Sequence, residues 1–521
     1  MASKRFLDTI LLILTLLMSL FVIASLTQLL RGGDILATFT QVTSQIIYVI
    51  FAVTIVLIIL ILVLENSSPV HTLAWIMVLI FLPIVGFVFY LLFGRNWRKI
   101  KLFKRKELSD VDFLHALDRT VPEFYSHHLE DGLEHKIHKL LKNNSKAIIT
   151  GYNEIELISD TTVAFAALCE GIEAASSHVH LEYFSIAADG TGNQLKDILI
   201  KKAREGVEVR FIYDDAACWS LPRKFKRELR AAGVKFVPFM PVWIPLLNSR
   251  MNYRNHKKLV IVDGKKGYLG GLNIGDKYLG LDPYYGYWRD SLAIFEGQSV
   301  FSMQAIFLAD WYFVSQENLF NADGFRRYID PDIGKDITNI SPVQMVASGP
   351  DSDQASILQL YFSAIANAQR SIRINTPYLI LNEALLMALK TSAISGVKIQ
   401  IIMPHQADHW IVFWGSRSYF QELLEVGVEI YEYTRGFMHA KILIVDDEIL
   451  GLGTANMDLR SFNHNFELTA LVFEDKIVDK AIEAFSDDLA FSRKIDLEEF
   501  NKRGLIQRSK ESICRLFSPL L

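Results

Sequence analysis

The chain has 521 residues, which is enough for two or three domains with sizeable cores. Its 54 basic and 58 acidic residues give a formal net charge of −4, and this balance argues against a dedicated nucleic-acid-binding protein. Hydrophobic residues make up 51% of the chain, more than in an average soluble domain, and the excess is concentrated at the N-terminus.

Three long apolar stretches occupy the N-terminal region, namely Thr9–Leu30, Ile46–Leu64 and Ala74–Phe93. Each is long enough to cross a bilayer as a helix. A signal peptide is the competing interpretation of the first stretch, but its apolar run is too long and no clear cleavage site follows it. We therefore expect residues 1–106 to form a membrane anchor with two or three transmembrane helices.

The basic residues that follow the last stretch predict the orientation of this anchor. Seven lysines and arginines lie between Arg95 and Lys106, whereas Glu65–His71 contains none. Because basic residues collect on the cytoplasmic side, we expect the rest of the chain to face the cytoplasm. Three spans would leave Lys4 and Arg5 outside, against the same rule, so the number of spans stays open.

From about residue 145 onward the sequence repeats itself. The segments "ASSHVHLEYFSIAADG" and "ILIKKAREGVEVRFIYDD" have counterparts in "AQRSIRINTPYLILNE" and "LKTSAISGVKIQIIMP". Each copy alternates a strand pattern, an amphipathic helix, a glycine and another strand, which is typical of a βαβ arrangement. The repeat predicts two α/β lobes.

Each copy also carries a short polar motif beside an apolar strand. His256, Lys258 and Asp263 match His439, Lys441 and Asp446, and each set is followed by an asparagine at the same spacing, Asn273 and Asn456. One such pattern could arise by accident, but two at equal spacing in equivalent halves indicate function. The histidines can meet only in a two-lobed fold with a pseudo-twofold between the lobes.

These paired blocks resemble the HKD motifs of the phospholipase D superfamily. "TLAWIMVLIFLPIVGFVFYLLFGRN", "GGLNIGDKYLGLDPYYGYWRD", "ASGPDSD" and "GTANMDLRSF" are further similar to bacterial cardiolipin synthases, its membrane-anchored members. The resemblance implies an α/β protein with N-terminal transmembrane helices and two phospholipase D-like lobes related by a pseudo-twofold. The expected lobes span residues 107–340, with a motif at 250–277, and residues 341–521, with a motif at 433–460.

The motif residues can cleave and remake a phosphodiester without a metal or a cofactor. A neutral imidazole attacks phosphorus to give a phosphohistidine, while a second, protonated imidazole protonates the leaving oxygen. Lys258, Lys441, Asn273 and Asn456 would bind the phosphate. The superfamily's usual order makes His256 the nucleophile and His439 the general acid, although the sequence itself is too symmetric to decide between them.

The carboxylates near the motifs have different expected roles. Asp263 and Asp446 belong to the HKD pattern and are candidates on that ground, yet strand alternation puts them opposite their histidines, which favours a structural role. Asp290 and Glu467, in the closing strands, are candidates for orienting the histidine rings. Exposed strand-end carboxylates are the alternative interpretation of this pair.

Three weaker features leave two interpretations each. The aromatic cluster Tyr284–Trp288 would line an acyl-chain entrance or pack in the core. The segment Arg223–Arg230 is a solvated helix face or a contact with anionic lipid. The terminal segment "LIQRSKESICRLFSPLL" alternates apolar and basic residues, which suits either a membrane surface or docking against the domain.

The family resemblance implies transfer of a phosphatidyl group from one phosphatidylglycerol to another, giving cardiolipin and glycerol. The expected partners are phosphatidylglycerol and cardiolipin in the bilayer, and no nucleic acid is expected. The protein would be a multi-pass protein of the bacterial cell membrane. A phospholipase D-type hydrolase, another phosphatidyltransferase and an inactive membrane scaffold are the alternatives. The sequence carries no signal for the oligomeric state.

Overall fold

The computed structural model describes residues 132–242, 252–319, 327–329, 333–352 and 354–518, with scattered positions between 44 and 86. The chain divides into two compact units, Met1–Asn96 and Trp97–Leu521. The first unit contains α3 (Pro69–Phe81). Within the described part of the chain, no helix combines the length and the apolar character that crossing a membrane requires. The expected span Thr9–Leu30 lies outside the described residues, and the other two expected spans lie only partly within them.

The first lobe of the second unit is built on a mixed sheet with the strand order β4-β3-β2-β6-β7-β8-β1. Its strands are β1 (Ile149–Asp160), β2 (His178–Tyr183), β3 (Glu208–Asp214), β4 (Lys235–Phe239), β6 (Lys258–Val262), β7 (Lys266–Gly270) and β8 (Tyr287–Gly297). Its helices are α7 (Thr161–Glu173), α8 (Gly190–Arg204), α9 (Arg223–Ala231) and α10 (Gln298–Ser315), with the short turn η4 (Asp276–Leu279). Strands β2, β3 and β4 run parallel through α8 and α9, as the βαβ pattern predicts, and the remaining pairs are antiparallel.

The second lobe repeats this sheet with the order β13-β12-β10-β15-β16-β18-β9. Its strands are β9 (Ile340–Ser348), β10 (Ser371–Asn375), β12 (Lys398–Pro404), β13 (Glu429–Tyr433), β15 (Ile442–Val445), β16 (Ile449–Gly453) and β18 (Asn465–Val472). Its helices are α12 (Ser356–Asn367), α13 (Glu383–Ile394), α14 (Trp410–Arg417), α15 (Phe420–Leu424), α16 (Leu459–Asn463) and α17 (Asp475–Ala490), and β19 (Ser492–Lys494), α18 (Leu497–Asn501) and α19 (Leu505–Leu516) follow. Strand order and strand direction therefore repeat lobe for lobe, and the predicted two-lobed α/β fold is confirmed.

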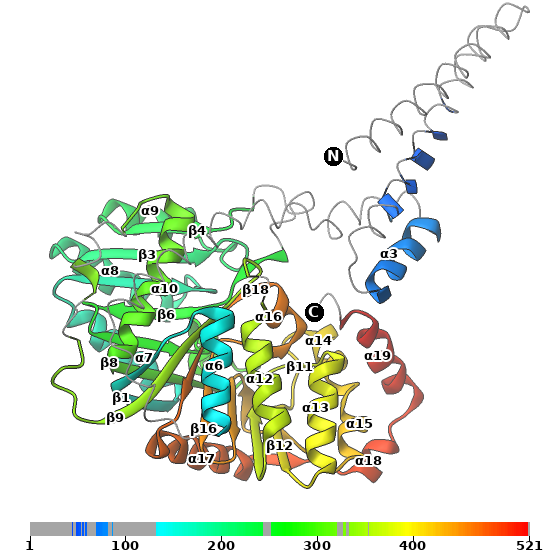
Figure 1. The fold of residues 1–521 in the computed structure, drawn as a ribbon. Coiled ribbons are helices and arrows are strands. Elements are labelled where there is room, and N and C mark those ends of the chain that lie inside the picture. Colours follow the sequence, from blue (N-terminus) through cyan, green and yellow to red (C-terminus); the bar gives the residue numbers. More distant parts are fainter. Residues whose placement is uncertain are drawn as a thin grey trace, which may run out of the picture. The chain divides into compact units, whose positions relative to one another are not determined.

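Three strand pairs cross from one lobe to the other. The long strand β1 pairs with β8 of its own lobe and with β9 of the second lobe. Two short strands, β5 (Arg254–Asn255) and β14 (Gly436–Met438), pair in parallel with the closing strand of the opposite lobe, β5 with β18 and β14 with β8. Figure 1 shows the first lobe in cyan to green and the second lobe in yellow to red.

The motif strands lie at the centre of each sheet because their side chains are apolar on both faces. Every residue of β6 (KLVIV) and of β15 (ILIV) is buried. Strands buried on both faces read as continuous apolar runs rather than as alternating patterns. One hydrophobic core joins side chains of both lobes, including Leu259, Leu269, Leu452 and Phe466, so the junction between the lobes is packed like a domain interior.

Helix α6 (Leu133–Ser145) precedes the first lobe in sequence but packs with the second lobe. Its side chains Ile137 and Leu141 are fully buried in the core that also contains Leu360 and Leu389. Asn144 Nδ2 donates to Gln359 Oε1 of α12 at 2.7 Å. Helix α6 therefore belongs to the core of the second lobe although it precedes the first lobe in sequence.

Candidate active site

Both motif histidines lie where one lobe's short strand meets the other lobe's closing strand. His256 follows β5, and its backbone N–H donates to the Phe466 carbonyl of β18 at 2.9 Å. His439 follows β14, and its N–H donates to the Arg289 carbonyl of β8 at 2.7 Å. The two histidines are therefore held by equivalent backbone contacts across the lobe junction.

The His256 ring is oriented by the second lobe. Its Nδ1 lies 3.0 Å from the Glu467 carboxylate and 3.1 Å from the Thr454 carbonyl. Glu467 also accepts from Thr454 Oγ1 at 2.5 Å and from Asn465 Nδ2 at 3.3 Å. Because both oxygens facing Nδ1 are acceptors, Nδ1 carries the proton of the neutral ring and Nε2 keeps a free lone pair.

The His439 ring is oriented by a carboxylate of the first lobe, and Lys441 Nζ of its own motif lies 3.0 Å from Nδ1 of this ring. The same Nδ1 lies 2.6 Å from Asp290 Oδ2, and Asp290 accepts from the Ser291 N–H through its other oxygen at 2.9 Å. The Trp288 ring packs beside the imidazole, with centroids 5.0 Å apart. The two histidine–carboxylate pairs are thus crossed, since each histidine comes from one lobe and its acid comes from the other.

Burial lowers the pKa of both histidines. For His439, burial and the Lys441 charge together outweigh Asp290 and lower the pKa to about 3. For His256, burial and the Lys258 charge lower the pKa, while Glu467 opposes the shift. In the free site both rings are consequently neutral at pH 7.

The two carboxylates stay ionised although they are fully buried. Burial alone would raise the pKa of Asp290, but Lys441 and His439 hold it below its usual value. Burial acts in the same direction on Glu467, whose pKa is held low by His256, Lys258 and the Thr454 hydroxyl. Ionised acceptors of this kind favour an imidazolium once one forms beside them.

The two motif lysines are buried close to the histidines. Lys258 and Lys441 are each 2% exposed, and each ammonium donates to the carbonyl of its own motif histidine, Lys258 to His256 at 2.7 Å. Burial lowers the pKa of Lys258, and burial lowers the pKa of Lys441 to about 8. Each lysine also lowers the pKa of the histidine of the opposite motif.

Removing an ammonium from water costs several kcal/mol, roughly, unless a counter-charge compensates. Here two ammonium groups and two carboxylates share one buried site. The formal charges of these four groups sum to zero, and a phosphodiester that contacts the two ammonium groups directly would lower the desolvation cost of the lysines.

Asn273 and Asn456 follow the motifs in equivalent loops. Both are 4% exposed. Asn273 Oδ1 accepts from the Ser185 N–H at 3.3 Å, and Asn456 Nδ2 donates to Asp458 Oδ2 at 3.2 Å. A hollow of about 500 Å³ is lined by Ser185, Asp189, Asp276 and Tyr278 among others, and Asn273 is not one of its lining residues.

The motif aspartates lie at the far end of their strands. Asp263 accepts the backbone N–H groups of Ser176, Ser177 and His178 at 2.8 to 2.9 Å. Asp446 accepts those of Gln369, Arg370 and Ser371 in the second lobe at 2.6 to 3.0 Å. Both aspartates adopt φ 55°, a left-handed conformation that Asp tolerates better than most residues. These contacts fasten the turn after the motif strand to the start of β2 or β10.

Several buried polar residues around His256 were not among the sequence predictions. Lys257 contacts Asp310 of α10, and Arg254 donates to Asp214 at 3.2 Å. Asn255 donates to Glu182, whose pKa is raised to about 8 by burial and by Asp310. The polar run "RNHKK" was a visible signal, but its partners come from distant segments that nothing in the local pattern indicates.

The aromatic cluster is mainly packing around His439. Trp288 is 2% exposed and lies against Tyr285 at 5.4 Å and Phe437 at 4.7 Å between ring centroids. Tyr284 is exposed, and its hydroxyl donates to the Ala407 carbonyl of the second lobe at 3.2 Å. Trp288 is therefore part of the packed core and does not line an acyl-chain entrance.

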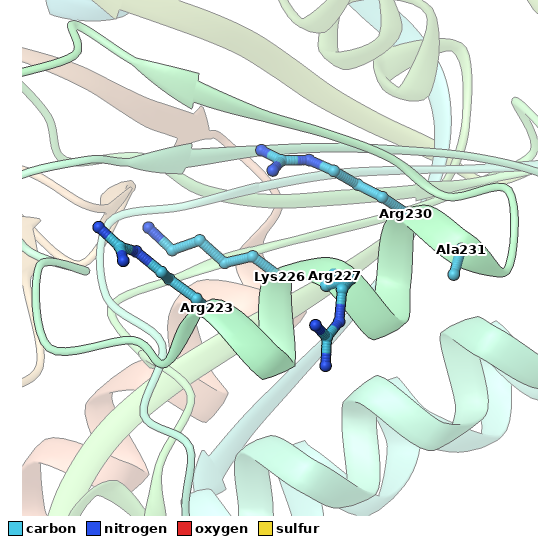
Figure 2. A pocket seen from close by; sticks show the side chains of 5 residues that line it. All are labelled: Arg223, Lys226, Arg227, Arg230 and Ala231. Atoms are coloured by element: carbon cyan, nitrogen blue, oxygen red, sulfur yellow. The ribbon is translucent and has the colours of Figure 1, made fainter.

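The basic segment forms helix α9, shown in Figure 2. Phe225 and Leu229 are buried, whereas the arginines and Lys226 border a hollow of about 440 Å³. Lys226 pairs with Asp215 at 3.9 Å, and Arg230 donates to the Phe236 carbonyl at 3.0 Å. These contacts are those of a solvated helix face.

Sequence comparisons relate this chain to known proteins. The family model described as "Cardiolipin synthase, PLD-like domain" matches residues 168–311 and 361–489, and a phospholipase D-nuclease N-terminal model matches residues 46–95. A cardiolipin synthase of Halalkalibacterium halodurans is 42% identical over 91% of this chain and 93% of its own length. The major cardiolipin synthase of Bacillus subtilis is 40% identical over 92% of this chain and 100% of its own length.

The chain belongs to the phospholipase D-like cardiolipin synthase family. A phosphatidylserine synthase from Haemophilus influenzae has a similar fold, with a TM-score of 0.55 at 14% identity. The match covers 74% of this chain and 99% of the Haemophilus influenzae protein. At that identity the likeness concerns the fold alone.

Proposed function

We propose that the chain synthesises cardiolipin by transferring a phosphatidyl group from one phosphatidylglycerol to a hydroxyl of a second, with release of glycerol. One observation carries this proposal: two neutral histidines, each held by an ionised carboxylate of the opposite lobe, lie beside two buried lysines. The membership of the cardiolipin synthase family selects the phosphatidyl transfer among the reactions that this site could perform.

In the first half-reaction His256 Nε2 attacks phosphorus and the bond from phosphorus to the glycerol oxygen breaks. His439 gives its proton to the departing oxygen, so glycerol leaves as a neutral alcohol. Nδ1 of His256 donates to Glu467, which stabilises the positive charge that the ring acquires. The product of this step is a phosphatidyl group bonded to His256.

In the second half-reaction the roles of His439 reverse. His439 removes the proton from a hydroxyl of the second phosphatidylglycerol, whose oxygen attacks phosphorus as the phosphorus–nitrogen bond breaks. Lys258, Lys441 and the two asparagines hold the non-bridging oxygens throughout. The bound phosphate anion also offsets the ammonium charge that lowers the pKa of His439 in the free site, so the ring can be protonated in the complex.

Because both substrates are lipids, we also propose that residues 1–106 anchor the enzyme in the bacterial cell membrane with two or three spans. In this arrangement the lobes of residues 107–340 and 341–521 face the cytoplasm, as the basic residues after Arg95 indicate. A cysteine at Ser109 should resist impermeant reagents added to intact cells, whereas one at Ser67 should react. Labelling at position 109 would place the lobes outside.

The synthase is tested by giving purified full-length enzyme vesicles of phosphatidylglycerol alone and identifying the lipids by mass spectrometry. We expect cardiolipin and glycerol in equal amounts, because a second phosphatidylglycerol intercepts the phosphohistidine. Phosphatidic acid as the dominant product would mean that water is the acceptor, and the chain would then be a phospholipase D-type hydrolase.

Gly271 should tolerate no side chain, because the Asp290 carboxylate occupies the space where one would lie. A Cβ at Gly271 would come within 2.1 Å of Asp290 Oδ1. Gly271→Ala should therefore displace Asp290 from His439 and lower kcat by about ten- to a hundredfold. Gly451→Ala is the matched control, since its Cβ would meet nothing closer than 3.7 Å. Equal activity of the two variants would mean that Asp290 does not position His439.

The pH dependence should report the charge of Lys441. Burial lowers its pKa to about 8, so the free site carries this ammonium below pH 8 and loses it above. The kcat/KM value, which reports the free enzyme, should fall more steeply once pH rises through about 8, because Lys441 then loses its proton in addition to the one that His439 must take up. The corresponding fall in kcat should occur at higher pH, because bound phosphate stabilises the ammonium. A kcat/KM value whose fall does not steepen by pH 9.5 would exclude this role for Lys441.

A further inference from the structure

Helix α19 (Leu505–Leu516) lies on the outside of the second lobe (Figure 1), and four of its apolar side chains are exposed. Leu505, Ile506, Ile513 and Leu516 are 81%, 74%, 54% and 80% exposed. At 3.6 residues per turn these positions fall within about a third of the helix circumference. A helix of a soluble domain normally packs its apolar face against the core, whereas α19 exposes its apolar face to solvent.

The opposite face of α19 is the one that packs on the domain. Glu511 and Cys514 are 3% and 1% exposed. Glu511, which is the helix's single acidic residue, receives Arg503 Nε at 2.8 Å. The side chain that usually faces water is thus buried in an ion pair, while the apolar side chains face outward.

The charges that border the exposed apolar face are positive. Arg508, Lys510 and Arg515 are the helix's basic residues, and Arg508 and Arg515 are exposed. An outward apolar stripe bordered by basic side chains is the pattern of a helix that lies in the headgroup region of an anionic bilayer. Arg515 also pairs with Glu422 at 2.8 Å, whereas no acidic residue of α19 itself borders the apolar face.

Helix α14 (Trp410–Arg417) lies under α19 and adds two exposed apolar side chains. Lys510 Nζ lies 5.1 Å from the centre of the Trp414 ring, and Arg515 donates to the Ser418 carbonyl at 3.3 Å. Trp410 and Ile411, at the start of α14, are 54% and 41% exposed. We call the six exposed side chains of the two helices the α14–α19 surface: Trp410, Ile411, Leu505, Ile506, Ile513 and Leu516.

This surface is connected to the phosphate-binding end of the site. The Ser416 hydroxyl of α14 accepts from the Leu379 N–H of β11 (Leu379–Ile380) at 3.0 Å. Strand β11 pairs with β17 (Met457–Asp458), which follows Asn456 directly. A bilayer in contact with α14 and α19 would therefore lie close to the segment that holds Asn456.

We propose that the α14–α19 surface docks on an anionic lipid bilayer, as a membrane contact of the second lobe that is separate from residues 1–106. The proposal rests on the proposed function in one respect, namely that both lipid substrates must enter the site from a bilayer. Docking here would hold the site at the headgroup level, where the acyl chains need not be transferred into water.

The test measures membrane depth at single positions of the full-length protein. Nitroxide labels are attached at Ile513→Cys, Leu516→Cys and, as the matched control on the other face of α19, Gln507→Cys. The background chain carries alanine in place of the three buried native cysteines and must match the parent protein in thermal unfolding and in its turnover of phosphatidylglycerol. In phosphatidylglycerol vesicles, labels at 513 and 516 should be accessible to oxygen but not to a water-soluble nickel complex, whereas the label at 507 should show the reverse.

A kinetic measurement on the same protein complements the depth measurement. Ile513→Glu/Leu516→Glu should raise the apparent KM for phosphatidylglycerol in vesicles about tenfold or more, with kcat in mixed detergent micelles unchanged. Gln507→Glu adds the same type of charge to the other face and should leave both constants unchanged.

Aqueous labels at 513 and 516 in vesicles that still make cardiolipin would overturn the docking proposal and spare the proposed function. Labels that the nickel complex cannot reach even in detergent would also overturn the docking proposal. Spin–spin broadening of their spectra would then indicate that a second copy of the chain covers the surface. Without broadening, another segment of the same chain would cover it. Labels inserted in the bilayer without any cardiolipin formation would instead sustain the docking and contradict the proposed function.

Discussion

His256→Ala and His439→Ala should each lower cardiolipin formation by at least about a thousandfold. Without His256 no phosphatidyl-enzyme can form, and without His439 the glycerol oxygen would leave as an alkoxide. Initial rates with radiolabelled phosphatidylglycerol measure the loss. His135→Ala, at an exposed position of α6, is the control and should retain full activity.

Both variants leave a buried carboxylate and a buried lysine without the ring beside them. His256→Ala leaves Glu467 and Lys258 buried without the ring, so its thermal unfolding must be compared with that of the parent protein. A folded His256→Ala or His439→Ala protein with activity within tenfold of the parent would contradict the paired mechanism.

The second large effect is expected from the crossed carboxylates. Glu467→Gln and Asp290→Asn preserve shape but can turn an amide N–H toward Nδ1 of the histidine. That donor would favour the tautomer whose proton lies on Nε2, and the nucleophilic lone pair of His256 would be lost in Glu467→Gln. We expect kcat to fall about a hundredfold or more in either variant, with a smaller change in KM.

An amide change at an exposed carboxylate, Glu448→Gln, is the control for these variants. General destabilisation would also lower the apparent kcat and leave KM unchanged, so the thermal unfolding of each variant is compared with that of the parent protein and kcat is expressed per folded enzyme. The shape of the pH–rate profile should change as well, because each carboxylate supports the charged form of its histidine. Unchanged kcat in Glu467→Gln would mean that the carboxylate has no role in the chemistry.

The repeat and the motif spacing were enough to predict the two-lobed α/β fold. Strand alternation, apolar runs and βαβ rhythm are local signals, and β6 and β15 obey them because they are central, fully buried strands. Pairing between the lobes is not a local signal. That β5 adds to β18 and β14 adds to β8, and that α6 belongs to the core of the second lobe, depends on tertiary packing alone.

The candidate site shows the same division between local pattern and tertiary contact. The sequence predicted Asp290 and Glu467 as partners for the histidines, and the structure places each at Nδ1 of one ring. It could not predict that each pair is crossed between lobes. The buried contacts of Lys257 with Asp310 and of Arg254 with Asp214 join segments far apart in the chain, so no spacing rule reveals them.

The central claim is a phosphatidyl group bonded to His256, and trapping that intermediate tests it most directly. Full-length enzyme is mixed for milliseconds with phosphatidylglycerol that carries one label on phosphorus and another on the headgroup glycerol, and the protein is then denatured in base. The account predicts an adduct that retains the phosphorus label, lacks the headgroup glycerol label, survives base, is lost in acid and maps to the peptide containing His256. Asp290→Asn should slow its formation, since glycerol would depart without a well-placed proton donor. An adduct on His439 would reverse the two histidine roles, and the absence of any adduct during rapid turnover would contradict the phosphohistidine mechanism itself.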